Sequence, residues 1–263
     1  STIPAPAVNE HPHALTFRSG ETSRDFLVVV GAPRSPLGHL HHDSGQVILG
    51  WRSRFWVTDP GYQQYREGAE RDYSIGPAAH NPPVINGIAQ SAHLAVVMAS
   101  SADQSPYHHL GVDLSRCYAG LPESAVVKRD LWIVDDKEPL VVVRDQFREL
   151  GLNANIQTHW LGGDHLAWAF VDGWARLSNG TEAFWLGTTD EGIGPAQLIR
   201  HEGTRGPLTL AHAATLAKGH GERCWVLWGD AAGGWQPPEL TIQAGSLKVT
   251  LPNAVSDAHS FKI

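Results

Sequence analysis

The chain has 263 residues, 42% of them hydrophobic and 18% charged, and its 20 Lys and Arg against 27 Asp and Glu give a formal net charge of −7. This composition is that of a folded globular protein, and an acidic chain without runs of like charge argues against a nucleic-acid-binding protein, which needs a basic face for phosphates. The longest apolar runs, such as 140–143, fall far short of the ~20 residues that span a bilayer, so no transmembrane segment is expected.

The N-terminal residues differ in composition from the rest of the chain. Residues 1–13 contain proline and asparagine and no apolar segment, and we assign them to an N-terminal extension or linker. They also lack the apolar core of a signal peptide, so any export signal would have been removed from this chain. The remainder, 14–263, is expected to form one domain, since large β-sandwiches reach this length around a single core.

From residue 26 onward, short apolar stretches recur with turn residues between them, a pattern typical of a many-stranded antiparallel protein. The predicted strands lie at 26–30, 47–49, 55–57, 94–98, 131–134, 140–143, 168–171, 183–186, 224–228 and 247–251. The best helical candidate is 211–217, which is short and is soon followed by Gly219 and Gly221. The sequence therefore predicts an all-β fold, a large multi-stranded antiparallel β-sandwich with few short helices.

The cysteine content is low. Cys117 and Cys224 are too few and too far apart for a zinc knuckle or a disulfide-dense scaffold. They could form one bridge in an oxidising compartment or remain two buried thiols, and the sequence leaves both possibilities open.

The histidines carry the clearest chemical signal. Three of the fifteen lie within four residues, in the segment Gly38-His39-Leu40-His41-His42-Asp43. In an extended chain, His39 and His41 point to one face and His42 to the other. A His-x-His pair taken alone is more often a surface feature than a metal site.

Two further residues complete a set of candidate metal ligands. Asp59 ends the next predicted strand, in Thr58-Asp59-Pro60-Gly61, where a hairpin over 46–57 would return it to the side of His41. His80 lies in Ala78-Ala79-His80-Asn81, after a polar loop that must return to the sheet. Two imidazoles and one carboxylate with an open fourth position form an ordinary tetrahedral zinc site. Taken alone, Asp59 would be interpreted as a carboxylate that caps its own turn.

In order and spacing, these three segments resemble the heparinase II/III-like polysaccharide lyases and the related alginate lyases. In that family the second histidine of the His-x-His pair, the aspartate of Asp-Pro-Gly and the histidine of Ala-His-Asn are the expected metal ligands. They fall here on His41, Asp59 and His80. The resemblance implies that one zinc ion, in a structural role, pins the loop 59–80 against the strand of His41, and that the protein is periplasmic or secreted.

The resemblance extends to the stretches 14–31 and 127–145 and is strongest over 14–90. It implies the β-sandwich that is the C-terminal domain of these lyases. In the family this sandwich follows an α-helical toroid, which supplies an Asn or His and a Tyr to the cleft. Because the present chain begins where the toroid would end, it is either the sandwich part of a two-part enzyme, with the toroid as another domain or chain, or a sandwich that works without one.

The family acts by β-elimination on acidic polysaccharides or oligosaccharides that contain uronic acid. The reaction needs a group that neutralises the substrate carboxylate, a base for the C5 proton and an acid for the leaving oxygen. His39, Tyr73 and Tyr65 are the candidate catalytic residues, because burial and neighbouring charges can tune imidazole and phenol for proton transfer. A loop tyrosine packed by its ring, with its hydroxyl in water, is the alternative for Tyr65 and Tyr73.

Four further residues are predicted to contact the glycan. Arg71 can pair with the substrate carboxylate, and Asn81 can orient the loop or the ligand through its amide. In Thr158-His159-Trp160, His159 is a second candidate for the cleft and Trp160 can stack on a sugar ring. A histidine whose ring nitrogens are hydrogen-bonded inside the protein, within a strand, would give the same pattern.

Two functions from other classes stay open. The chain could be a non-catalytic, zinc-stabilised module that binds carbohydrate or docks a partner, a reading that the missing toroid favours. It could also be a metal-dependent hydrolase, since the ligand set leaves a position for a water molecule.

Overall fold

The computed structural model describes residues 7–20, 25–33, 41–61, 66–91, 95–101, 107–136, 138–189, 197–200, 209–243, 245–252 and 258–262. Within these ranges the chain forms twenty strands, one α-helix and two short 3-10 helices. No helix there is long and apolar enough to cross a membrane. The all-β prediction is confirmed, and all ten predicted strand positions coincide with or overlap observed strands.

A five-stranded antiparallel sheet opens the chain, with the order β1-β2-β3-β4-β5. Its strands are β1 (Ala7–Glu10), β2 (Ala14–Ser19), β3 (Phe26–Gly31), β4 (Val47–Trp51) and β5 (Arg54–Val57). Alternate residues such as Phe17 and Val28 are buried, as a half-buried sheet requires. Because β1 pairs with β2 from Ala7↔Arg18 onward, the sheet begins inside the segment 1–13 that the sequence assigned to an extension.

An eight-stranded sheet forms the centre of the molecule, with the order β12-β13-β14-β17-β10-β9-β8-β7. Its strands are β7 (Val96–Ser101), β8 (His108–Asp113), β9 (Val126–Val134), β10 (Leu140–Arg148), β12 (Ala167–Val171), β13 (Trp174–Ser178), β14 (Ala183–Thr188) and β17 (Gly221–Asp230). A hairpin joins β9 to β10, with Val134 paired to Leu140. Both faces of this sheet are covered, because its central strands contribute to two separate apolar clusters.

A four-stranded sheet has the order β15-β16-β11-β6. Its strands are β6 (Val84–Ile85), β11 (Ala154–Leu161), β15 (Gln197–Ile199) and β16 (Thr209–Leu216). The prediction of a helix at 211–217 is wrong, because this segment belongs to β16 and pairs with β11 from Ala154↔Leu216 to Leu161↔Thr209. Its alanines favour a helix, but intrinsic propensity is only a weak determinant of structure, and cross-strand pairing overrides it.

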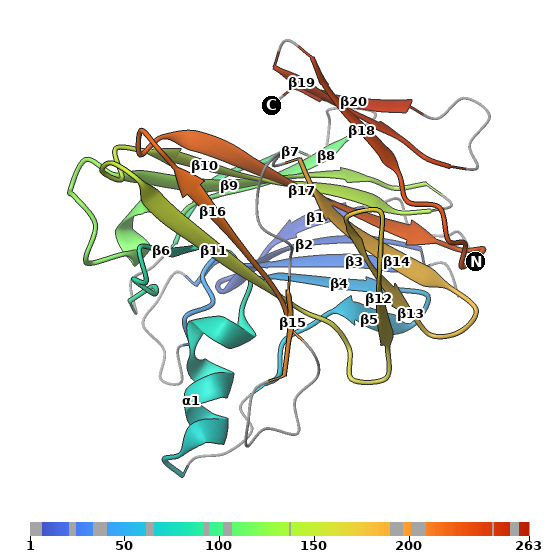
Figure 1. Cartoon of the computed structure of the whole chain (residues 1–263), viewed down its shortest axis with the longest axis horizontal. Coiled ribbons are helices and arrows are strands. Elements are labelled where there is room, and N and C mark those ends of the chain that lie inside the picture. Colours follow the sequence, from blue (N-terminus) through green and yellow to red (C-terminus); the bar gives the residue numbers. More distant parts are fainter. Residues whose placement is uncertain are drawn as a thin grey trace.

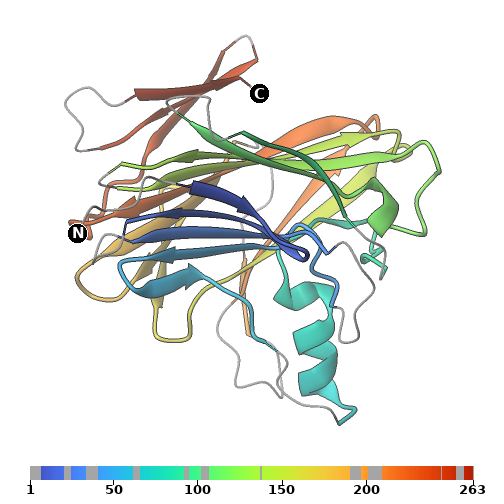
Figure 2. The ribbon, with the colours of Figure 1, turned by 180° about the vertical axis from the view of Figure 1, so that it is seen from behind.

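The sheets stack in three layers (Figures 1 and 2). The five- and four-stranded sheets pack against one face of the eight-stranded sheet through the larger apolar cluster, and they are joined where Thr58 N–H donates to Leu161 O at 2.9 Å. A three-stranded sheet covers the other face through residues such as Leu247 and Phe261. Its strands are β18 (Glu239–Gln243), β19 (Ser246–Thr250) and β20 (Ala258–Lys262).

The helical segments lie in the loops. The α-helix α1 (Ala69–Ile75) and the 3-10 helix η1 (Pro77–Ala79) fill the connection between β5 and β6, and η2 (Ser115–Cys117) follows β8. In Figure 1, α1 lies below the sheets, on the side where β6 and β15 end. Cys117 and Cys224 are both buried free thiols, so of the two possibilities the structure contains the unbridged one.

Candidate metal centre and cleft

Three residues from separate segments meet at one edge of the five-stranded sheet. His41 precedes β4, Asp59 follows β5 and His80 follows η1, and one possible ligand atom from each lies within 4.8 Å of the others. His80 Nδ1 is 3.0 Å from Asp59 Oδ2, and the rings of His41 and His80 are 5.5 Å apart between centroids. The structure thus brings together the three residues that the sequence grouped as metal ligands.

The environment of His80 fits a bound cation. Its side chain is fully buried, and neither ring nitrogen makes a hydrogen bond to the part of the chain that the structure describes. The short approach of Nδ1 to Asp59 lacks hydrogen-bond geometry, as expected for two ligands that face a common point rather than each other. A buried polar atom without a partner costs about 1–3 kcal/mol. A divalent ion held by His41, Asp59 and His80 would remove that cost and would retain an open fourth position.

The electrostatics favour the metal-binding forms of these side chains. Burial acts to raise the pKa of Asp59, but contact with His80 and the backbone N–H of Gly61 outweighs it, and the net pKa lies below the ordinary value. Burial, followed by the proximity of His80, lowers the pKa of His41. Asp59 is therefore an anion and His41 neutral at neutral pH, the forms in which both bind a cation.

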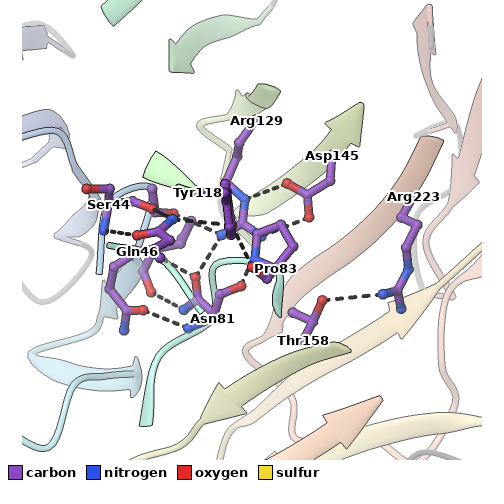
Figure 3. A network of polar contacts seen from close by, with 12 residues as sticks. Ser44, Gln46, Asn81, Pro83, Tyr118, Arg129, Asp145, Thr158 and Arg223 are labelled. Atoms are coloured by element: carbon purple, nitrogen blue, oxygen red, sulfur yellow. Dashed lines mark hydrogen bonds and ion pairs between the residues drawn. The ribbon is translucent and has the colours of Figure 1, made fainter. Parts of the chain in front are cut away.

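Asn81 fixes the position of its neighbour His80 (Figure 3). Its side chain exchanges two hydrogen bonds with the backbone of Val47, at 2.8 and 2.9 Å, and its own N–H donates to Gln46 Oε1 at 2.7 Å. Asn81 is fully buried and its amide is engaged by the protein. The prediction that it contacts substrate is therefore corrected, because the amide orients the loop instead.

Arg129 connects both ligand-bearing segments to the core (Figure 3). Its guanidinium donates to both carboxylate oxygens of Asp145, at 2.7 and 2.8 Å, to Gly45 O at 2.9 Å, and to Oδ1 and O of Asn81 at 3.0 and 2.9 Å. Gly45 follows His41 closely, and its φ of +82° favours glycine at this turn. Sequence reasoning missed this role, although Arg129 and Asp145 stood at core-facing positions of apolar strands.

The segment that carries His41 has a second anchor. The side chain of Gln90 accepts a hydrogen bond from Ser44 N–H at 2.9 Å and donates to Ser44 O at 2.7 Å, and the ring of His42 contacts Gln90 O. Tyr118 donates to Pro83 O at 2.5 Å and so holds the chain that leads away from His80. Both ligand segments are therefore fixed by buried polar contacts as well as by the sheet.

Tyr73 is the predicted catalytic residue that the structure places beside this centre. It lies on α1 with its ring buried, and its hydroxyl is 3.3 Å from Thr209 Oγ1. Burial raises the pKa of Tyr73, and the negative charge of Asp59 adds to the increase. Arg71, on the same helix, is partly exposed. His39 and Tyr65 lie outside the described residues.

The two candidates on β11 have different environments. His159 is half-buried on the outer face of the four-stranded sheet, where a ligand can reach it. Trp160 points the other way, is fully buried in the core and packs against Trp225 with ring centroids 5.4 Å apart. The prediction that Trp160 stacks on a sugar is corrected, because the strand alternation turns its indole inward.

Comparisons with known proteins agree with this architecture. The sequence profile described as heparinase II/III-like, C-terminal, matches residues 16–224. Two solved structures of heparinase III cover the whole chain with TM-scores of 0.74 and 0.72, at 13% and 11% identity, and the match takes in 43% of each. Heparan sulfate lyase HepC from Pedobacter heparinus covers 98% of the chain, with a TM-score of 0.70 and 15% identity over 42% of its own length. Identities this low show a shared fold, and the chain spans less than half the length of these structures. No curated protein sequence matches it.

Proposed function

The chain belongs to the heparinase II/III-like family, and from this premise we propose that it is the β-sandwich part of a polysaccharide lyase that acts on an acidic, uronic-acid-containing glycan. The observation that carries the proposal is the meeting of His41, Asp59 and His80 beside Tyr73. In this proposal the three residues form the metal centre and Tyr73 is the neighbouring proton-transfer group. The solved relatives are named heparinase III and heparan sulfate lyase, which supports the class of reaction.

We propose that the metal is zinc and that its role is structural. When bound, the ion would cross-link the segment before β4 with the ends of β5 and η1, and so hold the loop that contains α1. This role agrees with the chemistry, because abstraction of a proton α to a carboxylate requires no metal-bound hydroxide. An ion held by His41, Asp59 and His80 would therefore position the loop of Tyr73, and this chain's own side chains would transfer the protons.

The elimination assigns separate tasks to this chain's residues. A base removes the C5 proton, the C4–C5 double bond forms as the C4–O bond breaks, and an acid protonates the departing oxygen. The hydroxyl of Tyr73 is protonated at neutral pH, as a proton donor must be, and burial raises its pKa further. By resemblance to the family, His39 is the proposed base, and Tyr65 and Arg71 are further candidates for contact with the substrate.

A non-catalytic role is the second candidate, favoured by the groove beside His159 on the outer face of the four-stranded sheet, which a ligand can occupy. In this reading the sandwich binds glycan or docks a partner, and another domain or chain carries out the chemistry. The two roles are compatible if the sandwich binds substrate and the assembled protein cleaves it.

The test compares the zinc-loaded chain alone with the same chain joined to a helical toroid domain. Both are incubated with uronate polymers, and ultraviolet absorbance of the unsaturated uronate product is recorded. We expect product from the joined protein and little or none from the chain alone, although the chain should still retain the polymer in a binding assay. Cleavage that gives only saturated products would refute the lyase and favour a metal-dependent hydrolase, whereas efficient elimination by the chain alone would refute the two-part arrangement.

A further inference from the structure

A groove of about 450 Å³ lies on the outer face of the four-stranded sheet. Its described lining residues come from three strands: Gln157 and His159 of β11, Gln197 and Ile199 of β15, and Ala211, His212 and Ala213 of β16. Register brings them together, since His159 pairs with Ala211, Gln157 with Ala213, and Gln197 with Ala211. The volume lies within the range of small-molecule sites.

Strand β16, which forms part of the groove, also meets Tyr73 of α1. Thr209, whose hydroxyl is 3.3 Å from that of Tyr73, lies two residues before Ala211 and faces the same side of β16. The four residue steps from Thr209 to Ala213 span ~13 Å along the strand. Thr209 and the ring of Tyr73 are buried between the metal centre and the groove, so the groove begins about one sugar unit away from the Tyr73 hydroxyl.

The strands beneath the groove are held rigidly from the core side. Arg223 of β17 is fully buried and donates to Ile156 O at 3.3 Å and to Thr158 Oγ1 at 3.4 Å, and it also contacts His212 Nδ1. Arg223 pairs in register with Asp145, the residue that binds Arg129 on its other side. One row of buried charges thus supports both the metal centre and the groove (Figure 3), so their relative position is preorganised.

The chemistry of the lining favours an uncharged ligand. The carboxamides of Gln157 and Gln197 both donate and accept hydrogen bonds, and His159 adds a ring nitrogen. The side chains of Ala211 and Ala213 are small and apolar, which leaves room for a ring placed flat on the strand. No Asp, Glu, Lys or Arg occurs among the described lining residues. Among these described residues a carboxylate or sulfate would meet imidazoles but no permanent cation, whereas hydroxyl and acetamido groups find partners.

We propose that this groove is a subsite for an uncharged sugar unit of the glycan, next to the unit bound at Tyr73. The inference rests on the proposed function for the identity of the glycan. It adds a binding site away from the metal ligands and a preference for a particular kind of sugar unit.

The experiment fills the groove without touching the metal centre. Ala213→Trp places an indole across the groove from an exposed strand position, where an aromatic side chain is tolerated. Thr215→Trp is the matched control, since residue 215 is exposed on the same face of β16 but outside the groove. The double variant Gln157→Ala/His159→Ala removes the polar groups without adding bulk. Thermal unfolding of each zinc-loaded variant verifies the fold.

Binding is measured calorimetrically with two hexasaccharides. One alternates glucuronate with N-acetylglucosamine, and the other contains uronate units alone. We expect Ala213→Trp and the double variant to weaken the first ligand by roughly ten-fold, as the loss of about two hydrogen bonds implies. Thr215→Trp should leave its binding unchanged, and binding of the all-uronate ligand should change little in any variant.

The outcomes separate the subsite from the lyase. Unchanged binding of the alternating hexasaccharide to Ala213→Trp would overturn the subsite, and so would an equal loss for both ligands, which would contradict the preference for an uncharged unit. Absence of binding to the unsubstituted chain would overturn the subsite as well. The lyase proposal would fail separately, if the chain joined to a helical domain formed no unsaturated product.

Discussion

Arg129 of β9 and Asp145 of β10 form a bidentate ion pair between in-register residues, and the same guanidinium reaches both segments that carry the candidate metal ligands. Both side chains are essentially excluded from solvent. The remaining donors of Arg129 bind Gly45 and Asn81, close to His41 and His80 in the chain. This cation therefore links both candidate ligand segments to the core, in addition to the contacts of Gln90 and Tyr118.

The first prediction concerns this pair. Arg129→Met leaves the Asp145 carboxylate buried without its main partner, and such a loss costs about 3–5 kcal/mol. Urea unfolding should record that decrease, and zinc affinity should fall because Gly45 and Asn81 lose their donor. The double variant Arg129→Met/Asp145→Leu should recover stability but not zinc affinity, since no donor returns to the ligand segments.

Arg144→Met is the matched control for this prediction. Arg144 faces the opposite side of the same sheet, where it binds Asp130 at 2.9 Å with its side chain partly exposed. Its replacement should reduce stability less and leave zinc affinity unchanged. Equal loss of zinc in both variants would contradict a specific positioning role for Arg129.

The second prediction is that the purified chain binds about one zinc ion. His41→Ala and Asp59→Ala should lose the metal and lower the melting temperature, because an ion bound only by the folded state stabilises it by about 2.7 kcal/mol when free zinc is about 100 times Kd. Elemental analysis and thermal unfolding with and without chelator provide the measurement. His220→Ala, an exposed histidine on another loop, should behave as the unsubstituted chain. Protein prepared without chelator that contains no metal would refute the site.

The third prediction assigns Tyr73 to proton donation. Tyr73→Phe keeps the buried ring and removes only the hydroxyl that meets Thr209, so fold and zinc content should be retained. In the protein joined to its helical part, the elimination rate should fall roughly 10²- to 10⁴-fold, the usual contribution of a positioned acid. Because the pKa of Tyr73 is raised, the acid form persists to higher pH than for a free phenol, and the alkaline limb of the rate profile should lie correspondingly high.

Tyr107→Phe is the matched control for Tyr73→Phe, because it removes a tyrosine hydroxyl elsewhere in the protein. Tyr107 packs against Phe261 of the three-stranded sheet, on the far side of the eight-stranded sheet. Its replacement should not alter the elimination rate. If Tyr73→Phe retained full activity, the proton donor would have to be sought elsewhere in the cleft.

Local sequence signals were sufficient for ten of the twenty described strands and for the spatial grouping of His41, Asp59 and His80. Val28 and Val30 alternate with partly exposed neighbours and are bounded by turn residues, a pattern that depends only on nearby sequence. The grouping of His41, Asp59 and His80 followed from a short hairpin and one returning loop. Both inferences needed contacts between segments that are close in the chain.

Contacts between segments that are distant in the chain were harder to predict from the sequence. Arg129 and Asn81 are 48 residues apart and Arg223 and Thr158 are 65 apart, and neither pairing follows from a local pattern. The direction of Trp160 depended on which face of β11 meets the core, and alternation alone does not decide that. The alanines of β16 suggested a helix because their pairing with β11 was unknown.

The last prediction separates two histidines that are two positions apart. His41→Ala should abolish zinc binding, lower the melting temperature and impair glycan cleavage, because it removes one of three ligands whose atoms lie within 4.8 Å of one another. His39→Ala should leave metal content and stability intact while it reduces elimination, because His39 is assigned to the substrate and not to the ion. Zinc content, thermal unfolding and the rate of unsaturated product are measured on the same preparations. His42→Ala is the third member of the series, since its ring contacts Gln90 O rather than the other ligands, and it should lower stability with little loss of zinc. Equal metal loss in His39→Ala and His41→Ala would show that the division between a substrate histidine and a metal histidine is wrong.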